Sequence, residues 1–317
     1  MEVSMKYVIK KILGLIITLL IVSMLTFFAF ELIPGDPARS ILGTDGTLEQ
    51  VQALREEMGL NRPLPQRYGE WVFNFLHGDM GNSYYYQKSV QDLIGDRIPI
   101  TVAMTILSFS MILVLSVAVS IFSVRYANRL FDRIFLIVDQ IMMSVPPFFI
   151  GIIFTAVFGL TLHWFTPGGY VSYEKDVGGF IGYLILPSLA IALPRAAMAA
   201  KLLRSSLLDE MQKDYVRTAY SRGNGPWRVL LHHVLKNGIL PVITFLGMTA
   251  ADIIANSIVV EQVFGIPGVG RMLISSISKR DYPMVEAIIV LIAVVTLVMN
   301  ILVDVLYKKL DKRIEVI

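Results

Sequence analysis

The stretch Ile98–Val124, IPITVAMTILSFSMILVLSVAVSIFSV, contains no Asp, Glu, Lys or Arg. An α-helix rises about 1.5 Å per residue, so about 20 apolar residues cross the roughly 30 Å of hydrocarbon in a bilayer. This stretch therefore predicts a membrane-spanning helix. The whole chain agrees, because 55% of its 317 residues are hydrophobic and only 17% are charged. A soluble domain carries about a quarter charged residues, so the composition argues against a soluble enzyme and excludes a disordered chain.

Five further apolar stretches have the length of a membrane span. The first, Ile12–Ile33, is too long for a signal peptide and lacks a small-residue cleavage site. Two others contain prolines, at Pro146-Pro147 and at Pro187 and Pro194, so we expect kinks or breaks there. The chain is predicted to be an all-α polytopic membrane protein, one transmembrane domain over residues 1–317. Its six predicted spans are 12–33, 98–124, 134–165, 180–200, 238–264 and 284–307.

The distribution of Lys and Arg predicts the orientation of these spans. With the N-terminus inside, the inner segments hold 17 Lys/Arg in 67 residues, and the outer segments hold 10 in 97. Cytoplasmic loops carry an excess of Lys and Arg, so both termini are expected inside.

Residues 34–97, here called the acidic loop, follow the first span with nine Asp/Glu against six Lys/Arg. Thr47 and Gln50 have the spacing of a capping box, which predicts a short helix near Thr47–Met58. A second apolar group that includes Trp71 follows Pro65. The acidic loop is therefore expected to fold into a small cap on the outer side.

Residues 201–237, here called the basic loop, join the fourth and fifth predicted spans. Apolar side chains recur at four-residue steps from Leu203 to Ala219, which predicts one amphipathic helix ending at Gly223. A second short helix is expected after the break at 224–226. Two interpretations remain open. The loop is either a basic helix on anionic lipid or a docking element that passes rigid-body motion to the spans. Its basic residues are Lys201, Arg204, Lys213, Arg217, Arg222, Arg228 and Lys236.

Charged residues inside the predicted spans are candidates for function, because each costs about 2.5–3.5 kcal/mol at the bilayer centre on insertion scales. Asp252 lies mid-span, so it either lines a transport pathway or is satisfied by a neighbouring helix. Asp139 and Arg195 lie near the inner ends of their spans. Either the two side chains form an ion pair, or the Arg195 side chain snorkels to the membrane interface. A structural role is favoured for both residues. Three further acids lie near span ends, where solvation is expected: Glu261, Glu286 and Asp304.

The sequence offers no catalytic machinery. It contains no Gly-x-x-x-x-Gly-Lys-Ser/Thr segment, so no P-loop is expected, and the glycines of 265–270 are interpreted as a tight turn. Cysteine is absent, and the four histidines lack the spacing of metal ligands. The adjacent His232 and His233 point about 100° apart on a helix. We therefore expect no catalytic residue, no metal site and no cofactor in this chain.

Eight motifs in a fixed order carry a resemblance that covers nearly the whole chain. They are Pro34–Pro37, Gly59–Leu64, Gly78–Ser83, Ser144–Gly151, Asp214–Gly223 with Val229–Pro241, Glu261–Gly270, Arg280–Pro283, and Asp304 and Tyr307 with Asp311–Ile314. Together they resemble the permeases of ATP-binding-cassette (ABC) importers. More narrowly, they resemble the first-subunit type of the dipeptide, oligopeptide and nickel permease family. Three positions depart from the pattern: Arg217 replaces a glutamate, Lys236 stands where a proline is usual and the proline is displaced to Pro241, and Lys312 replaces a proline.

The resemblance implies a type I ABC importer permease fold and a role in ATP-driven import of oligopeptides or dipeptides. The membrane would be the cytoplasmic membrane of a bacterium or archaeon. The implied partners are a second permease subunit, two ATP-binding subunits that hold ATP and Mg, and an extracytoplasmic substrate-binding protein that meets the acidic loop. Arg217, Thr218, Ala219 and Gly223 would form the element that couples to the ATPase, and Asp252 is the candidate for the translocation pathway.

Three alternatives stay open at this point. Within the family, nickel or metal-chelate uptake is not separated from peptide uptake. An ion-coupled secondary transporter would use Asp252, Asp139 and Arg195 as a relay, although the basic and acidic loops argue against it. A membrane scaffold without transport would leave Asp252 without a purpose.

Overall fold

The computed structural model describes residues 5–32, 35–43 and 46–310, and these residues form helices and loops without a β-strand. The all-α prediction is thereby confirmed for the described chain. Its backbone contacts divide into two compact units, residues 1–100 with 267–297 and residues 101–266 with 298–317. Pro34, at the start of the first motif, and the tail motif 311–314 lie outside the described residues.

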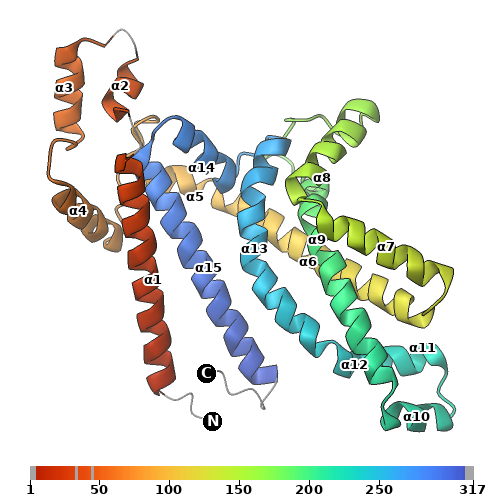
Figure 1. The fold of residues 1–317 in the computed structure, drawn as a ribbon. Coiled ribbons are helices and arrows are strands. Elements are labelled where there is room, and N and C mark those ends of the chain that lie inside the picture. Colours follow the sequence, from red (N-terminus) through yellow and green to blue (C-terminus); the bar gives the residue numbers. More distant parts are fainter. Residues whose placement is uncertain (1–4, 33–34, 44–45, 311–317) are drawn as a thin grey trace. The chain divides into compact units, whose positions relative to one another are not determined.

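The first unit combines the first span with the acidic loop (Figure 1). Thr47 Oγ1 accepts a hydrogen bond from the Gln50 amide, and Gln50 Oε1 accepts one from the Thr47 amide, so the predicted capping box is confirmed. Tyr68 lies 2.9 Å from Ser23 through its hydroxyl and packs edge-on against Phe27, which fastens α4 to α1. The helices are α1 (Met5–Leu32), α2 (Pro37–Leu42), α3 (Leu48–Glu57), α4 (Leu64–Leu76), α5 (Val90–Gly95), α14 (Val269–Ser278) and the start of α15 (Tyr282–Leu310).

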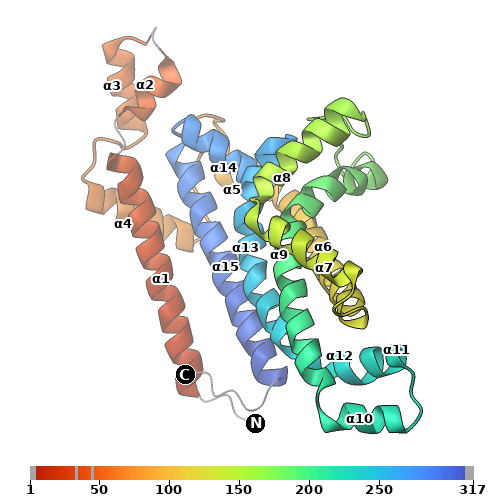
Figure 2. The same ribbon diagram turned by 45° about the vertical axis from the view of Figure 1, so that its right-hand side comes forward.

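The second unit is built around α9 (Val177–Met211), which packs against α7, α8 and α13 (Figures 1 and 2). Small residues let these helices approach closely, as is usual between membrane helices. Ala190, Ala196 and Ala200 of α9 are buried, and a Cβ on Gly151 of α8 would lie only 3.1 Å from the Phe264 ring of α13. The other helices are α6 (Ile98–Arg125), α7 (Leu130–Ser144), α8 (Pro147–Phe154), η1 (Thr155–Thr161), α10 (Asp214–Ser221), α11 (Pro226–Arg228), η2 (Val229–Val234), α12 (Leu235–Gly238) and α13 (Leu240–Phe264).

Five described helices are long and apolar enough to cross a membrane, and a bent pair brings the possible number to six. The bent pair is Leu130–Ser144 with Pro147–Thr161, which turn by 103° at the expected Pro146-Pro147 break. Pro187 and Pro194 behave differently, because α9 runs through both without a break. Neighbouring membrane helices tolerate such prolines by satisfying the backbone groups that proline frees.

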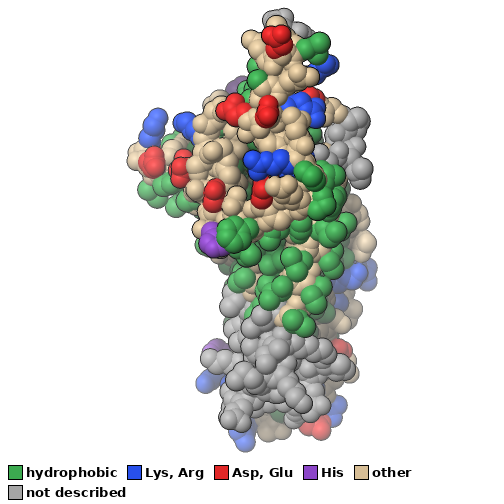
Figure 3. All heavy atoms as spheres, turned by 90° about the vertical axis from the view of Figure 1, so that its left-hand side faces the viewer, with side chains coloured by type: hydrophobic (Ala, Val, Ile, Leu, Met, Phe, Trp, Pro, Cys, Tyr) green, Lys and Arg blue, Asp and Glu red, His purple; other side chains and the backbone are tan. Residues whose placement is uncertain are grey.

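Apolar side chains on α1 face outward, as expected for a lipid-exposed helix. Ile21 and Leu25 are 53% and 66% exposed. Figure 3 shows charged side chains over the acidic loop and apolar side chains below them. The described surface of the first unit therefore changes from charged at the acidic loop to apolar on the neighbouring part of α1.

Candidate functional site

The basic loop does not contain the single amphipathic helix that its periodicity predicted. The fourth span, α9, continues to Met211, and the chain then breaks at Gln212 and Lys213 before α10 begins. Lys213 has an extended backbone, with ψ of 151°. Glu210 bridges the break, because it pairs with Lys213 and accepts a 2.7 Å hydrogen bond from the Tyr215 hydroxyl. The break contains no glycine or proline, so no local signal in the sequence marks it.

The short helix α10 has a buried face and an exposed face. Val216 and Ala219 are 1% and 6% exposed and face inward, and α10 packs against η2. Arg217 and Thr218 point away from this contact, and the Arg217 side chain is 80% exposed. Of the four predicted coupling residues, Arg217 and Thr218 therefore present their side chains outward, whereas Ala219 lies on the buried face of α10.

Gly223 ends α10 in a left-handed conformation, with φ of +81°. The Gly223 amide donates to the Tyr220 carbonyl at 2.9 Å, and the Asn224 amide donates to the Ala219 carbonyl at 3.4 Å. This pair of bonds is a Schellman motif, in which glycine is preferred because it has no Cβ penalty. A Cβ on Gly223 would meet no atom within 4 Å, so its backbone conformation, and not crowding, requires glycine in this chain.

The segment after the glycine turn attaches the basic loop to the second span, α6. Trp227 packs edge-on against Phe122, with ring centroids 5.9 Å apart, and the Arg125 guanidinium lies 5.8 Å from the Trp227 ring centroid. Val229 and Leu230, which follow Trp227 closely in the sequence, are buried. The predicted second helix is confirmed, as α11, η2 and α12 together.

A buried ion pair joins three helices near the end of α9, before the chain breaks at Gln212 and Lys213. Arg204 on α9 donates two 2.8 Å hydrogen bonds to the carboxylate of Asp132 on α7. Ser123 of α6 also donates to Asp132, and the Asn128 amide donates at 2.9 Å. The Asp132 side chain is only 2% exposed. Sequence reasoning counted Arg204 among the basic residues of the loop but missed Asp132, because 72 residues separate the partners.

Asp252 on α13 is paired with Arg195 on α9, with 3.0 Å between Oδ2 and Nη2. Arg195 therefore pairs with Asp252 and not with Asp139, so the interpretation that Asp139 and Arg195 pair is wrong. Asp139 is buried on α7. The Asp252 side chain remains 51% exposed in the isolated chain. Arg195 therefore neutralises the charge of the carboxylate but leaves it accessible to solvent.

The acids near span ends are less solvated than the sequence predicted. Glu261 is fully buried on α13 and accepts a 2.7 Å hydrogen bond from Thr101 on α6. Glu286 is 7% exposed near the start of α15. The solvated interpretation is therefore wrong for both, because each carboxylate is buried among protein side chains. The side chain of Asp304 lies outside the described residues.

Two of the sequence motifs meet in the first unit. Ser83, which ends the Gly78–Ser83 motif, donates a 2.5 Å hydrogen bond to Asp281 of the Arg280–Pro283 motif. The Tyr84 amide donates to the same carboxylate at 2.9 Å. Burial raises the pKa of Asp281 above its ordinary value, against the effect of these hydrogen bonds. The contact closes the acidic loop onto the start of α15.

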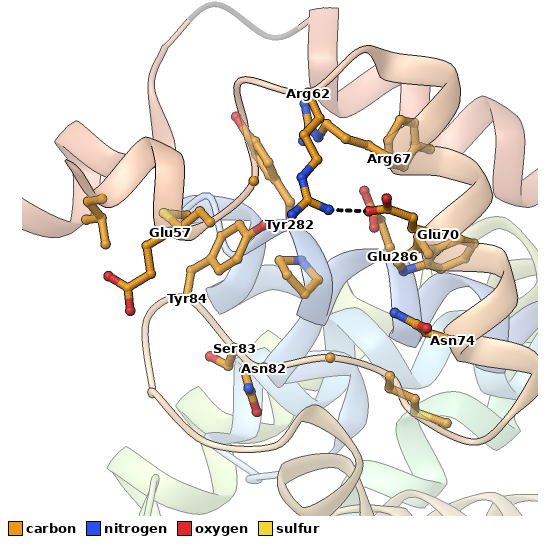
Figure 4. Close-up of a pocket in the computed structure, with 18 of the residues that line it drawn as sticks. Glu57, Arg62, Arg67, Glu70, Asn74, Asn82, Ser83, Tyr84, Tyr282 and Glu286 are labelled. Atoms are coloured by element: carbon orange, nitrogen blue, oxygen red, sulfur yellow. Dashed lines mark hydrogen bonds and ion pairs between the residues drawn. The ribbon is translucent and has the colours of Figure 1, made fainter. Parts of the chain in front are cut away.

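A cavity of about 440 Å³ lies beside this contact, between the acidic loop and the start of α15. Arg62 reaches across it and pairs with Glu70 at 2.8 Å (Figure 4). Gln66 also donates to Glu70, and these hydrogen bonds hold the pKa of the Glu70 carboxyl below its ordinary value. Glu286 and Arg67 lie on the same side as Glu70, whereas Tyr84 lies on the opposite side. The sequence did not predict this cavity.

Residues 112–316 match the family model described as binding-protein-dependent transport system inner membrane component. Residues 4–105 match the model of the N-terminal part of such membrane components. The chain belongs to this family of transport permeases. The permease is thus similar to its family from end to end, as the motifs indicated.

Individual relatives agree with the family match. A putative peptide transport system permease protein of Brucella abortus (strain 2308) is 33% identical over 97% of this permease and 98% of its own length. The glutathione transport system permease protein GsiC of Escherichia coli (strain K12) is 36% identical over 98% and 99%. A crystal structure of an amino acid ABC transporter with histidines matches with a TM-score of 0.51 and 15% identity, over 69% of this chain and 94% of that chain. At that identity the match supports the fold alone, which is the type I permease fold.

The permease brings two of its candidate regions together within the second unit. Arg204 and Asp132 tie α6, α7 and α9 together at the root of the basic loop, and α10 projects beyond that root (Figure 2). The pair Asp252–Arg195 lies farther along α9, which runs without a break from Arg195 to Arg204. One rigid helix therefore carries both the polar pair and the anchor of the basic loop. Among the described residues, no group of three or more His, Asp or Glu has the arrangement of a metal site.

Proposed function

We propose that this permease is the membrane subunit of an ATP-driven importer that carries dipeptides or oligopeptides across the cytoplasmic membrane of a bacterium or archaeon. It works as a single permease domain with a second permease subunit, two ATP-binding subunits and an extracytoplasmic substrate-binding protein. The peptide cargo is supported by the relatives above, which are named as peptide and glutathione transport permeases. ATP and Mg are held by the partner subunits.

The observation that carries the proposal is the construction of α10. This helix is short, it buries Val216 and Ala219 against the protein, and it ends in a Schellman turn at Gly223. A rigid element that presents Arg217 and Thr218 to the outside suits a protein partner better than a lipid surface, because Val216 and Ala219 are already covered and its exposed residues apart from Tyr220 are polar. Closure of the ATP-binding subunits would push on α10.

The push on α10 has a mechanical route to the membrane spans. Arg204 fixes α9 to α6 and α7 through Asp132, and Trp227 fixes the far side of the basic loop to α6. Because packed helices move as rigid bodies, a displacement of α10 is passed to α9 and to the pair Arg195–Asp252. We propose that this pair lines the translocation pathway, which agrees with the half-exposed Asp252 carboxylate.

The test compares two glycines of the same loop in the complete transporter. Gly223→Val places a β-branched residue at a positive φ, whereas Gly225→Val changes a residue at φ of −68° with open space around it. We expect Gly223→Val to lose peptide uptake while its membrane level stays normal, and Gly225→Val to keep uptake. Normal uptake by Gly223→Val would contradict the role of α10, and absence of peptide uptake by the wild-type complex would contradict the cargo.

A further inference from the structure

The cavity in the first unit has the size and the lining of a small-molecule site. Its volume of about 440 Å³ lies within the roughly 300–1,000 Å³ that ligand pockets occupy. Its wall combines carboxylates, guanidiniums and aromatic rings, among them Arg62, Glu70, Trp71 and Tyr84. The Trp71 indole Nε1 is a buried donor with no hydrogen-bond acceptor in the described chain. Such a donor is rare in a folded protein.

The charges of the cavity lie close together on one side. Figure 4 shows the Arg62 guanidinium reaching Glu70, with Glu286 next to Glu70 and with Glu57 pointing away from the group. The side chains of Arg62 and Glu70 are 56% and 46% exposed, so solvent reaches both partners of the pair. An exposed ion pair contributes little stability, and its opening therefore costs little. The pair can be exchanged for contacts with a ligand that carries both charges.

We infer that this cavity binds the termini of a short peptide, as a receiving site built by residues of the first unit alone. The inference rests on the proposed function for its choice of ligand class. The carboxylate of the peptide takes the place of Glu70 on Arg62, in the bidentate geometry that a guanidinium offers. The peptide ammonium then pairs with Glu70, which Arg62 has released. The rings of Trp71 and Tyr84 cover the side chains between the two termini.

The neighbouring segments explain why such a site would hold its shape. Gly81 and Asn82 line the cavity directly before Ser83, whose bond to Asp281 fixes their loop to the start of α15. Tyr68 and Trp71 stack on α4 with ring centroids 6.3 Å apart, and Tyr68 is bonded to α1. These parts of the cavity wall are thus fixed to α1, α4 and α15 before a ligand binds, and the ion pair is the contact that has to change on binding.

Equilibrium dialysis of a random tripeptide library tests the inference. The full-length permease is placed in nanodiscs with the subunits that purify with it but without any substrate-binding protein, and retained peptides are measured by mass spectrometry. We expect saturable retention of the free tripeptides. Acetylation of the N-terminus or amidation of the C-terminus is expected to weaken retention about 10- to 100-fold, because each removes a charge-assisted contact.

Three variants locate the binding. Arg62→Gln and Glu70→Gln should each weaken retention by about the same factor, and Asn74→Trp should abolish it by filling the cavity. Arg55→Gln is the matched control, because Arg55 forms a similar ion pair with Asp36 in the same loop but does not line this cavity. Unchanged retention in Glu70→Gln and Asn74→Trp would overturn the inference, even if Arg62→Gln fails to fold.

Uptake by the complete transporter separates the two proposals. Normal peptide uptake with no tripeptide retained by the wild-type permease overturns the receiving site and leaves the proposed function standing. Absence of peptide uptake by the wild-type transporter overturns the proposed function itself. Retention that equals that of empty nanodiscs counts against the receiving site.

Discussion

Breaking the ion pair between Arg204 and Asp132 should destabilise the permease strongly. Arg204→Met leaves a carboxylate that is 2% exposed with only the Ser123 hydroxyl and the Asn128 amide as donors. Removing one partner of a buried ion pair costs about 3–5 kcal/mol, because the remaining charge is left uncompensated. At about 2–4 °C per kcal/mol for a unit of this size, the unfolding midpoint should fall by about 6–20 °C.

A second substitution distinguishes the lost ion pair from lost packing. Asp132→Asn in the Arg204→Met background removes the stranded charge and keeps an acceptor oxygen for the Asn128 amide. The double variant should therefore recover most of the lost stability. Arg217→Met is the control, because Arg217 and its partner Asp214 are 80% and 97% exposed and 3.8 Å apart, so no measurable change is expected.

The assay is heating of the detergent-solubilised permease at one fixed rate, followed by size-exclusion chromatography with fluorescence detection. A midpoint for Arg204→Met within about 2 °C of the wild type would refute the reasoning. So would a double variant that is less stable than Arg204→Met, because the charge on Asp132 would then not be the source of the loss.

Two further predictions concern other polar groups. Asp252→Asn removes the carboxylate charge beside Arg195 and should change the rate of peptide uptake while the complex still assembles; wild-type uptake would return Asp252 to a purely structural role. The raised pKa of Asp281 means that the folded protein binds this proton more tightly than the unfolded chain, so this group favours folding below about pH 4 and its contribution is lost as the pH rises through the folded pKa. Asp281→Asn should remove that part of the pH dependence of the unfolding midpoint, and an identical pH profile in both proteins would argue against it.

The features that the sequence predicted correctly depend on local signals. The capping box of Thr47 needs only residues three apart, and the spans need only a long apolar run. Gly223 correctly predicted the turn at the end of the helix, because few residues other than glycine adopt a positive φ. The break at Pro146-Pro147 likewise follows from the missing backbone donors. These features are decided within a few residues, so one sequence was enough to find them.

The features that the sequence missed depend on which helices become neighbours. Arg204 donates a hydrogen bond to Asp132, which lies 72 residues away in the sequence. Glu261 accepts one from Thr101, which lies 160 residues away. Neither pairing has a periodicity that marks it. The break before α10 also has a tertiary cause, because Val216 and Ala219 are buried on η2 only when the chain turns at Lys213. The regular four-residue spacing continued through this break and so predicted one helix where two exist.

The absence of cysteine from the chain provides the most direct test of the central claim, that α10 docks on an ATP-binding subunit. Thr218→Cys introduces a unique exposed thiol on α10, and Lys175→Cys introduces one on an exposed segment of the predicted outer side. Each is labelled with benzophenone maleimide in the native membrane and irradiated, and the crosslinked products are identified by mass spectrometry. The account predicts that the label on residue 218 captures a P-loop ATPase and that the label on residue 175 does not. No ATPase product from residue 218, or equal capture from both positions, would contradict it.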